Sequence, residues 1–457
     1  MALIAYPSSH RSSLTAFATI LLAFAAASSC SAQDWYHMEI SKGNPELIRL
    51  AAADFKPTSA DPATSTEKRA FDATLYNDLA AAGIFDMVAK SMLPQSTPGA
   101  QGEINLAQWA SAPTSASMVA FGNLAVAGGT LIVNGTLDDA KNSGFPLVFT
   151  KRYTIPASED SARQVAHQFA DEIIFRLGGG IPGIAESKIY YIKDTGPNTK
   201  EIAEMDYDGA NQHVLTHIGT DAMSPRVSPD NSRIAFSALD NRFGFQIRMF
   251  SLLLNRMVSF PSAGGANISP AWAPNGTQLA FSSSRGGRSE IWISDPQGNS
   301  ARRLTSFGLD ASPTWNPKTG AQIGFISGRT GLPQLYIMDA DGSGVQRMTD
   351  GGYASSPSWS PNGQFIAFAW NRKYGPGAPG GQDIYVMEIA TKRWIQLTHD
   401  IGRCDFPTWS PDGRHIAFAT SPDGRQAHTR IMTMLADGTE RRALTGSGAD
   451  MPNWSWK

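Results

Sequence analysis

Short runs of alternating apolar and polar residues fill the chain from residue 188 to its end, and they recur in one fixed order. Each period begins with Pro-x-Trp, passes through Ser-Pro-Asp/Asn-Gly, and continues with Ile-Ala-Phe or a close variant. A longer alternating run follows, and a short run that usually ends in Leu-Thr closes the period. Because alternation is the pattern of a half-buried strand and Asp/Asn-Gly favours a tight hairpin, each period predicts four strands, which we name a to d.

Six copies align on the proline of strand a, and their spacing indicates the architecture. The gaps between these prolines are 45, 43, 44, 50 and 45 residues, close to the length of a four-stranded propeller blade. The long gap holds "NRKYGPGAPGGQ" (371–382), a Gly/Pro-rich insertion that a loop absorbs at small entropic cost. We expect each proline at the start of its strand, where no ladder N–H is lost. The six are Pro225, Pro270, Pro313, Pro357, Pro407 and Pro452.

The two ends of the repeat region predict how the repeats close into a ring. The first repeat begins with a strand of type b, "KIYYIK" (188–193), whereas the chain ends with a strand of type a, "MPNWSWK" (451–457). A terminal strand a that completes the first blade would leave no free sheet edge. We therefore predict a six-bladed β-propeller over residues 188–457, closed by the C-terminal strand.

Residues 33–180 lack this period and predict a small α/β domain. Two stretches have the spacing of amphipathic helices with polar starts and glycine stops, and several others read as strands. Residues 181–187 would then be a linker, and the whole chain a multidomain α+β protein with an N-terminal α/β domain followed by an all-β propeller. The helices are expected at 65–83 and 158–179, and the strands at 35–40, 47–55, 118–126, 129–139 and 145–156.

Residues 1–32 have the pattern of a cleavable export signal. Arg11 precedes an apolar run at 14–27, and the small residues Cys30 and Ala32 mark a cleavage site before Gln33. The apolar run is too short to span a membrane as a helix. A lipoprotein signal, with Cys30 as the lipidated residue, is the alternative. Cleavage before Gln33 leaves Cys404 as the remaining cysteine, so the exported protein would have no internal disulfide.

Charge and motifs argue against several classes of function. The formal charge of −2 gives the chain no general attraction to nucleic acid or anionic lipid. The sequence has no G-x-S-x-G, H-E-x-x-H, C-x-x-C or P-loop motif, and His213 and His217 straddle a predicted strand end. "DADGSG" (339–344) opens like a calcium loop but lacks the terminal acid, so we expect a plain turn. We therefore predict no enzymatic activity, no cofactor and no metal site.

Two recurring positions bear on what the propeller does. Loops between strand d and the next strand a should rim the channel on one face, and their sequences differ from copy to copy. Variable loops on a rigid scaffold are typical of recognition, although unconstrained loops would vary as well. The repeated tryptophan is better explained by packing between blades than by ligand stacking. It occurs as Trp272, Trp315, Trp359, Trp409 and Trp454.

The order of these segments resembles the TolB family. The resemblance rests on the signal peptide, on "NDLAAAGIFDMV" (77–88) and "VAHQFADEIIFRL" (165–177), and on a first repeat that reads "IYYI…EMDYDGANQHVLT". It implies a non-enzymatic periplasmic scaffold of the Tol–Pal system that supports outer-membrane integrity and cell division. The implied partners are the lipoprotein Pal, at the channel face of the propeller, and TolA, at the N-terminal segment. Neither nucleic acid nor membrane insertion is implied, and we expect a monomer.

The resemblance also implies which residues face the partners. Met223 matches the "MSP" of the family's first channel loop, and residues 33–42 correspond to the TolA-facing segment. The other loops differ in residue type from well-known members, and "AWNRKYGPGAPGGQ" (369–382) departs from the usual blade length. The expected Pal-facing residues are Met223, Ala266, Asn267, Ile268, Asp310, Ala311, Tyr353, Ser355, Asp405 and Asp450, and the expected TolA-facing residues are Gln33, Asp34, Trp35 and Tyr36.

Two other functions stay open from the sequence. A secreted propeller hydrolase or lyase would need convergent polar groups in the channel, which the sequence does not display. A carbohydrate- or peptidoglycan-binding sensor would use the same variable loops. The sequence also leaves undecided whether Cys30 is lipidated, whether an ion sits in the channel, and whether the two domains are coupled.

Overall fold

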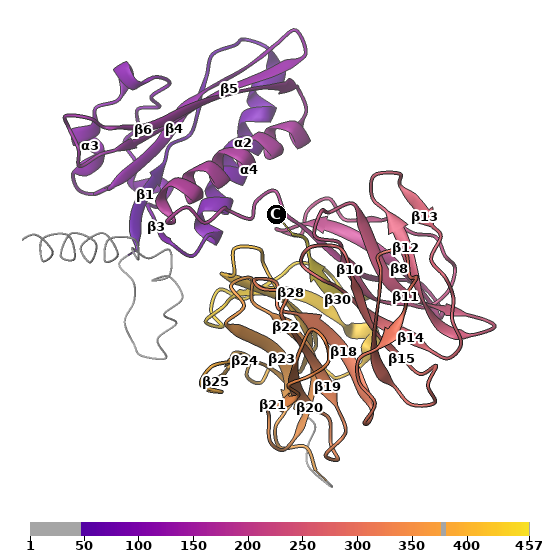
Figure 1. Cartoon of the computed structure of the whole chain (residues 1–457). Helices are drawn as coiled ribbons and strands as arrows, with labels where there is room; N and C mark the ends of the chain where they lie inside the picture. Colours follow the sequence, from indigo (N-terminus) through magenta and orange to yellow (C-terminus); the bar gives the residue numbers. More distant parts are fainter. Residues whose placement is uncertain (1–46, 376–380, 457) are drawn as a thin grey trace, which may run out of the picture. The chain divides into compact units, whose positions relative to one another are not determined.

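The computed structural model describes residues 47–375 and 381–456, in which a mixed α/β domain precedes a six-bladed β-propeller (Figure 1). The expected fold class is therefore confirmed. The export signal, the strand expected at 35–40 and the TolA-facing residues Gln33–Tyr36 lie outside the described residues.

A mixed sheet forms the N-terminal domain, with strand order β3-β1-β4-β5-β6 and with β2 beside β4. β1 pairs in parallel with β3 and β4, whereas β4, β5 and β6 form an antiparallel meander. The four expected strands in this region are present with slightly shifted ends, and β2 and β3 are additional. The strands are β1 (Ile48–Ala52), β2 (Lys56–Pro57), β3 (Phe85–Met87), β4 (Met118–Ala127), β5 (Thr130–Asp139) and β6 (Leu147–Pro156).

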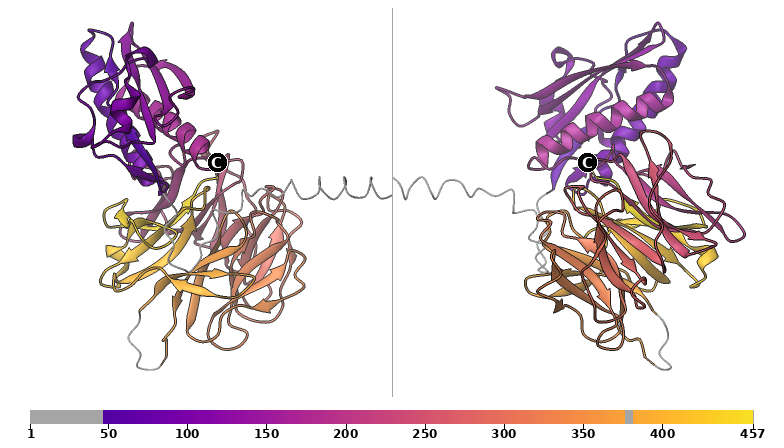
Figure 2. Two further views of the ribbon diagram at one scale, coloured as in Figure 1. Left: turned by 90° about the vertical axis from the view of Figure 1, so that its left-hand side faces the viewer. Right: turned by 45° about the vertical axis from the view of Figure 1, so that its right-hand side comes forward.

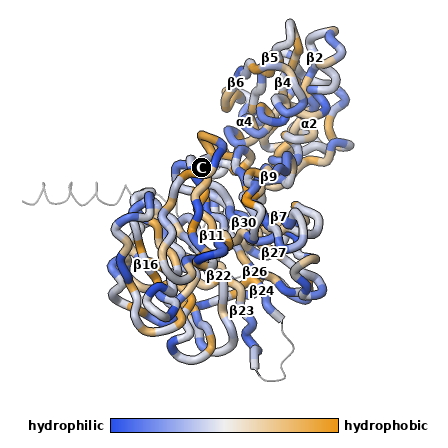
Figure 3. Tube along the Cα trace, turned by 90° about the vertical axis from the view of Figure 1, so that its right-hand side faces the viewer, coloured by the Kyte–Doolittle hydropathy of each residue, from blue (hydrophilic) through white to orange (hydrophobic). Residues whose placement is uncertain are grey.

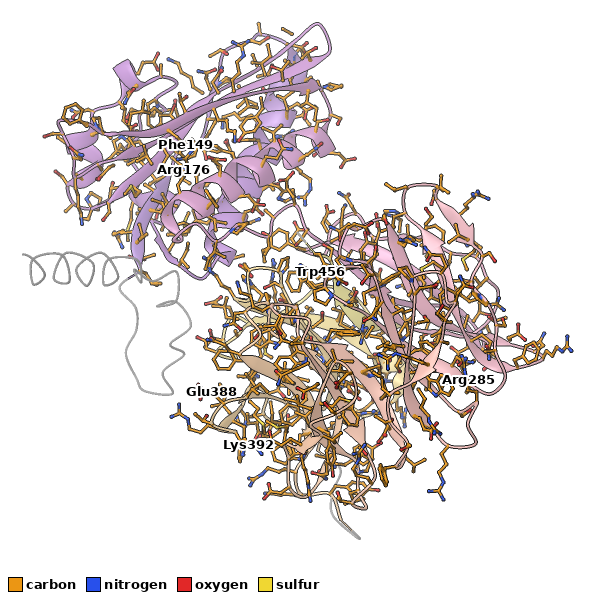
Figure 4. The ribbon with its side chains drawn as sticks, viewed as in Figure 1. Phe149, Arg176, Arg285, Glu388, Lys392 and Trp456 are labelled. Atoms are coloured by element: carbon orange, nitrogen blue, oxygen red, sulfur yellow. The ribbon has the colours of Figure 1, made fainter. Side chains whose placement is uncertain are left out.

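Two long helices, α2 (Pro62–Ala81) and α4 (Glu159–Leu177), pack together on one face of this sheet (Figure 1). α4 begins where expected because the Ser158 side chain accepts a hydrogen bond from the Ser161 N–H. α2 begins three residues earlier than expected, because Asp61 caps the Ala63 N–H and Pro62 suits a first helical turn. Figure 4 shows Arg176 of α4 beside Phe149 of β6, with the guanidinium 5.8 Å from the ring centroid.

The other face of the sheet is covered by a short helix that the sequence analysis did not anticipate. α3 (Leu106–Ala110) places Trp109 against Val119 and Phe121 of β4, and all three side chains are almost fully buried. Residues of β4 therefore alternate between two apolar layers, as the pleat of a strand requires. The remaining short helical turns among the described residues are η2 (Lys90–Met92), η3 (Gln101–Glu103) and η4 (Gln426–His428).

Six four-stranded antiparallel sheets, one for each repeat, form the propeller (Figure 2). Blade 1 contains β30 (Ala449–Trp454), β7 (Lys188–Gly196), β8 (Thr199–Asp206) and β9 (His213–Val214). Blade 2 contains β10 (Ala222–Val227), β11 (Arg233–Asp240), β12 (Gly244–Ser251) and β13 (Arg256–Val258), and blade 3 contains β14 (Asn267–Trp272), β15 (Leu279–Ser283), β16 (Glu290–Ser294) and β17 (Arg302–Arg303).

Blades 4 to 6 repeat the same order of inner strand a to outer strand d. Blade 4 contains β18 (Asp310–Trp315), β19 (Gln322–Ser327), β20 (Gln334–Asp339) and β21 (Gln346–Arg347). Blade 5 contains β22 (Tyr353–Trp359), β23 (Phe365–Asn371), β24 (Asp383–Glu388) and β25 (Trp394–Gln396), and blade 6 contains β26 (Arg403–Trp409), β27 (His415–Ser421), β28 (Arg430–Leu435) and β29 (Arg442–Ala443).

Burial falls from the middle strands of each blade to its outer strand. Strands β23 and β27 are buried along their whole length, whereas β17 and β21 are exposed. Figure 3 shows how hydrophobic and hydrophilic stretches alternate along the strands and turns of the propeller. The outer strands are short, which limits the free sheet edge that each blade presents to other chains.

The predicted closure of the ring by the C-terminal strand is confirmed. β30 pairs antiparallel with β7, so the last strand of the chain is the inner strand of the first blade. Two backbone-linked contacts fasten its end: Lys188 N–H donates to Ser455 Oγ at 3.0 Å, and Ser455 N–H donates to the Lys188 carbonyl at 2.8 Å.

The expectation that the repeated prolines start their strands is wrong. Strand a begins three or four residues earlier in every blade, and each proline lies within it at a β-bulge. The residue before each proline has a φ between 49° and 54°. A bulge leaves its extra residue outside the ladder, so the missing proline N–H costs no strand-to-strand hydrogen bond. The residues with positive φ are Ser224, Ser269, Ser312, Ser356, Phe406 and Met451.

The repeated tryptophan joins neighbouring blades, as the packing interpretation predicted. We call the contact between the inner strands of two neighbouring blades a seam. At four of the six seams the indole N–H donates to a carbonyl of the preceding inner strand, at 3.0 to 3.2 Å. Trp454 instead donates to Ser187 Oγ at 2.7 Å. All five indoles are at most 6 % exposed. The four carbonyl bonds run from Trp272 to Arg226, Trp315 to Ala271, Trp359 to Thr314 and Trp409 to Ser358.

The seam between β30 and β10 is held by different hydrogen bonds, because the first repeat has Val227 where the others have tryptophan. The Asn453 side chain accepts a hydrogen bond from the Val227 N–H at 2.9 Å. Trp456, two residues beyond β30, donates from Nε1 to the Val227 carbonyl at 3.3 Å. The last residues of the chain thus replace the missing indole.

The recurring Leu-Thr has a structural role just past strand d. Its threonine hydroxyl accepts a hydrogen bond from a backbone N–H of strand c, which belongs to the second residue of the strand in four blades and to the fourth residue of β8 in blade 1. The five bonds measure 2.9 to 3.0 Å. They join Ile202 to Thr216, Ile291 to Thr305, Leu335 to Thr349, Ile384 to Thr398 and Ile431 to Thr445.

Deleting residues 450–457 should destabilise the propeller strongly, because β7 loses its inner neighbour and two seams lose their side chains. We expect the melting temperature to fall by about 10 °C or more, measured by circular dichroism. Removal of Lys457 alone is the control and should leave melting unchanged. Near-normal melting of the longer deletion would contradict the closure.

Replacing Trp359 by Phe tests the indole bond at a seam. The change keeps an aromatic ring but leaves the Thr314 carbonyl without its donor, and we expect a loss of about 1 kcal/mol beyond the packing cost. Trp109→Phe is the matched control, because Trp109 is equally buried and its N–H has no hydrogen-bond partner among the described residues. Equal losses in urea denaturation of both variants would argue against the bond.

Candidate functional site

The inner strands line the centre of the propeller with two rings of side chains. Positions three residues apart in these strands share a face, because the bulge adds one residue to the normal alternation. The mouth ring lies two residues before each proline and consists of Met223, Ile268, Ala311, Ser355, Asp405 and Asp450. The inner ring lies one residue after each proline and consists of Arg226, Ala271, Thr314, Ser358, Thr408 and Asn453, all of which line one cavity.

Most of the expected Pal-facing residues lie in strands rather than in loops. Nine of the ten lie within the inner strands, since those strands begin before the prolines, and Ala266 alone precedes its strand. Six of them make up the mouth ring. Five of these six are half-buried, and Asp405 is 6 % exposed. The remaining three are Asn267, Asp310 and Tyr353.

Asn267 and Asp310 are turned away from solvent and hold arginines against aromatic rings. The Asp310 carboxylate, 0 % exposed, accepts two hydrogen bonds from Arg329 Nη2 at 3.1 Å. Arg329 in turn lies 4.9 Å from the centroid of Tyr336. Asn267, 3 % exposed, accepts from Arg285 Nη2 at 3.0 Å in the same way. Both polar groups are thus already engaged within the propeller.

These arginine stacks were missed by the sequence analysis, although the sequence contains a signal for them. Arg285 and Arg329 each follow strand b in a Ser-x-Arg-x-Gly stretch, and in both the arginine Nε donates to that serine, Ser283 or Ser327. Arg285 lies 4.6 Å from the centroid of Trp292 on the next strand. Figure 4 shows Arg285 at the side of the propeller. Such cation–π stacks stiffen the loops of the channel face.

Two neighbouring carboxylates give the mouth ring an acidic side. Asp405 accepts hydrogen bonds from Gln382 Nε2 and Arg403 Nη2, both at 3.0 Å. Asp450 accepts from the Met451 N–H at 2.8 Å. Burial is the main cause that raises the pKa of Asp450 to about 6, and the negative charge of Asp405 contributes to this rise. At neutral pH Asp450 is therefore ionised at a cost in stability.

The opposite side of the mouth ring is apolar and is bordered by exposed apolar side chains. Met223, Ile268 and Ala311 of blades 2 to 4 carry no polar side-chain group other than a thioether. Phe307 and Leu309, in the loop before β18, are 77 % and 67 % exposed. Exposed apolar residues of this size, gathered at one face, are typical of a protein-interaction surface. The sequence analysis did not single out Phe307 or Leu309.

A pair of aromatic side chains lies on the same face. Tyr353 at the start of β22 and Tyr374 after β23 are 38 % and 50 % exposed, and their ring centroids are 5.6 Å apart. Loops from strand d to a and from b to c share one end of the blades because the strands alternate in direction. Together with Phe307 and Leu309, these tyrosines form what we call the apolar rim.

One group resembles a catalytic triad in composition but does not have its geometry. Ser410 and Asp412 lie in the turn after β26, His415 is the first residue of β27, and all three are at most 5 % exposed. The Ser410 hydroxyl binds Asp412 and the backbone of His415 rather than the imidazole. The imidazole Nε2 is 2.7 Å from the Ala81 carbonyl. The three residues therefore stabilise a buried turn, as Asx-type side chains commonly do.

Metal and membrane features can be assessed for residues 47–375 and 381–456. No group of three or more His, Cys, Asp or Glu side chains in these ranges is arranged to hold a metal ion. In the same ranges no helix has the length and apolar character needed to cross a lipid bilayer. Cys404, the one cysteine there, is buried, and burial raises the pKa of its thiol to about 11.

The fold and the channel face define a class of protein: a β-propeller scaffold with an N-terminal α/β domain and a shaped, partly apolar channel mouth. Comparison with known families identifies the family of this protein. The TolB beta propeller domain matches residues 176–456, and the TolB amino-terminal domain matches residues 36–143. The chain belongs to the TolB family and is a homologue of proteins of the Tol-Pal system.

Individual relatives are moderately similar. The Tol-Pal system protein TolB of Anaeromyxobacter sp. (strain K) is 31 % identical over 313 residues, which cover 66 % of this chain and 67 % of the relative. The corresponding protein of Gluconobacter oxydans is 31 % identical over 292 residues, 63 % of this chain and 59 % of the relative, so the match spans less than two thirds of it. The crystal structure of TolB from Acinetobacter baumannii has the same fold, with a TM-score of 0.74 and 23 % identity over 92 % of this chain and 99 % of the other.

Replacing Asp450 by Asn should stabilise the protein at neutral pH. The folded-state pKa of about 6 lies above the usual value of 3.8, so the folded state binds more protons than the unfolded state between these pH values. Stability therefore falls as pH rises through this window, and the penalty is complete above it. We expect Asp450→Asn to gain about 1–3 kcal/mol at pH 7.5 and little at pH 4.

Urea denaturation at several pH values measures this effect. Asp350→Asn, at an exposed position of the loop before β22, is the control and should show no pH-dependent gain. A gain for Asp450→Asn that did not shrink between pH 7.5 and pH 4 would rule out the titration of Asp450 as its cause.

Proposed function

We propose that this protein is a non-enzymatic, periplasmic interaction scaffold of the Tol–Pal system. It is exported through the signal at residues 1–32 and cut before Gln33. The channel face of the propeller docks the lipoprotein Pal, and the segment that begins at Gln33 docks TolA. Membership of the TolB family supports a role in the Tol–Pal system. The apolar rim beside the mouth ring is the observation that supports the channel face as the docking surface.

The chemistry of the mouth ring defines what its partner should present. Met223, Ile268 and Ala311 offer an apolar half, suited to an aliphatic or aromatic anchor. Asp405 and Asp450 offer an acidic half, suited to a basic side chain or a hydrogen-bond donor. An epitope with these two features side by side would fit both halves at once, and the mismatched orientation would bury a charge against apolar groups. The arginine stacks keep the loops preorganised, which lowers the entropy lost on binding.

A scaffold role also agrees with the polar groups of the described residues. Asp310 and Asp405 are paired with arginines, and the Ser410 turn is closed by its own backbone. General acid–base catalysis needs a side chain within reach of a substrate and free to exchange a proton. Turnover in a broad screen of esterase, peptidase and glycosidase substrates would contradict the non-enzymatic part of the proposal.

Met223→Arg should weaken Pal binding about tenfold or more, because a long cation would replace an apolar contact at the mouth. The measurement is isothermal titration with the soluble domain of Pal from the same organism. Leu253→Arg is the matched control: Leu253 is 80 % exposed in the β12–β13 hairpin, at the opposite end of the blades. Unimpaired binding by Met223→Arg, or equal loss in both variants, would argue against the channel face.

A further inference from the structure

Arg226 is the one charged residue in the inner ring. The other five repeats have Ala271, Thr314, Ser358, Thr408 and Asn453 at this position. The Arg226 side chain is half-buried, and its Nη1 donates to the carbonyl of the adjacent Pro225 at 2.7 Å. Within residues 47–375 and 381–456, no carboxylate lies within ion-pair distance of the guanidinium.

The cavity beside Arg226 has a volume of about 220 Å³ and lies at the end of the channel where strand a turns into strand b. Its walls are tryptophans, prolines and small polar residues, and none of its lining residues is acidic. The indole N–H groups of Trp315, Trp359 and Trp409 are already used at the blade seams. The indoles therefore present aromatic carbon to the cavity, and the guanidinium is its strongest free donor.

An uncompensated cation in such a place is costly, because burial removes water without supplying a counter-charge. The effect is visible in Arg226, since desolvation lowers the pKa of its guanidinium to about 10. The nearest acids of the mouth ring lie three positions along the strands, a path of about 10 Å. An anion that enters the cavity would restore the missing charge next to the guanidinium.

We propose that this cavity, which we call the Arg226 site, binds a monocarboxylate with a small apolar body. A planar guanidinium matches a carboxylate through two parallel hydrogen bonds. The aromatic and proline walls suit an apolar body, and a single cation balances one negative charge rather than two. The acidic half of the mouth ring disfavours anions at the opposite end, so the ligand enters from the side of the a–b turns. The carboxylate comes from a free organic acid or from the C-terminus of a peptide.

Trp456 offers a spectroscopic readout at this site. Trp456, which is labelled in Figure 4, lines the cavity together with the repeated tryptophans. A carboxylate that fills the cavity should therefore change the intrinsic fluorescence in a saturable way.

The test titrates benzoate into the chain that begins at Gln33, followed by tryptophan fluorescence and thermal melting. We expect saturable binding and a rise in melting temperature with benzoate but not with its neutral analogue benzyl alcohol. Inorganic phosphate should bind at least about tenfold more weakly, because it carries more charge than one guanidinium balances. An acetylated tripeptide with a free C-terminus, compared with its amide, separates the peptide source from the free acid.

Arg226→Gln should abolish benzoate binding, and Arg226→Lys should weaken it about tenfold by removing the bidentate geometry. Arg302→Gln, on the exposed outer strand β17, is the matched control and should bind normally. Because Arg226 is uncompensated, Arg226→Gln should melt no lower than the unchanged chain, which guards against misfolding as the cause. Equal binding of benzyl alcohol, or retained benzoate binding in Arg226→Gln, would overturn the proposal, as would a preference for phosphate.

Discussion

Neighbouring blades share no backbone ladder, so the ring depends on side chains that reach from one inner strand to the next. The indole N–H of the repeated tryptophan does this at four seams, and each acceptor is the carbonyl of an inner-ring residue. In each of these residues the main-chain carbonyl therefore joins two blades, while the side chain lines the channel. Arg226, Ala271, Thr314 and Ser358 can differ freely for this reason, since the seam needs only their carbonyls.

The six blades thus have nearly the same backbone, but the side chains that line the channel differ from blade to blade. Its mouth is apolar on blades 2 to 4 and polar to acidic on blades 5, 6 and 1, while a lone cation lies further along. The proline bulge fixes this layout, because it sets the two rings three residues apart on one face. The aspartates at the mouth also bind a backbone N–H group of the bulge: the side chains of Asp405 and Asp450 each accept a hydrogen bond from the N–H of the following residue. Recognition and backbone geometry are therefore coupled at these two positions.

The sequence was sufficient for the repeat, the blade order and the closure, because those follow from a period and from two unmatched ends. It was not sufficient for the bulge, since a proline in an alternating run reads as the start of a strand rather than its middle. Asn267 and Asp310 were assigned to variable loops, yet they are buried partners of arginines that follow the neighbouring strand, and such pairing depends on cross-strand register. The apolar rim was missed because single exposed residues such as Phe307 carry no periodic signal.

The position of β30 has a consequence for the order of events during biosynthesis. A domain usually folds once its full length has left the ribosome, with N-terminal parts first. Here the first blade waits for the final strand, because β7 receives its inner neighbour only when residues 449–454 have been made. The propeller therefore cannot complete its ring until residues 449–454 have been made, and blade 1 keeps an unpaired inner edge on β7 until then.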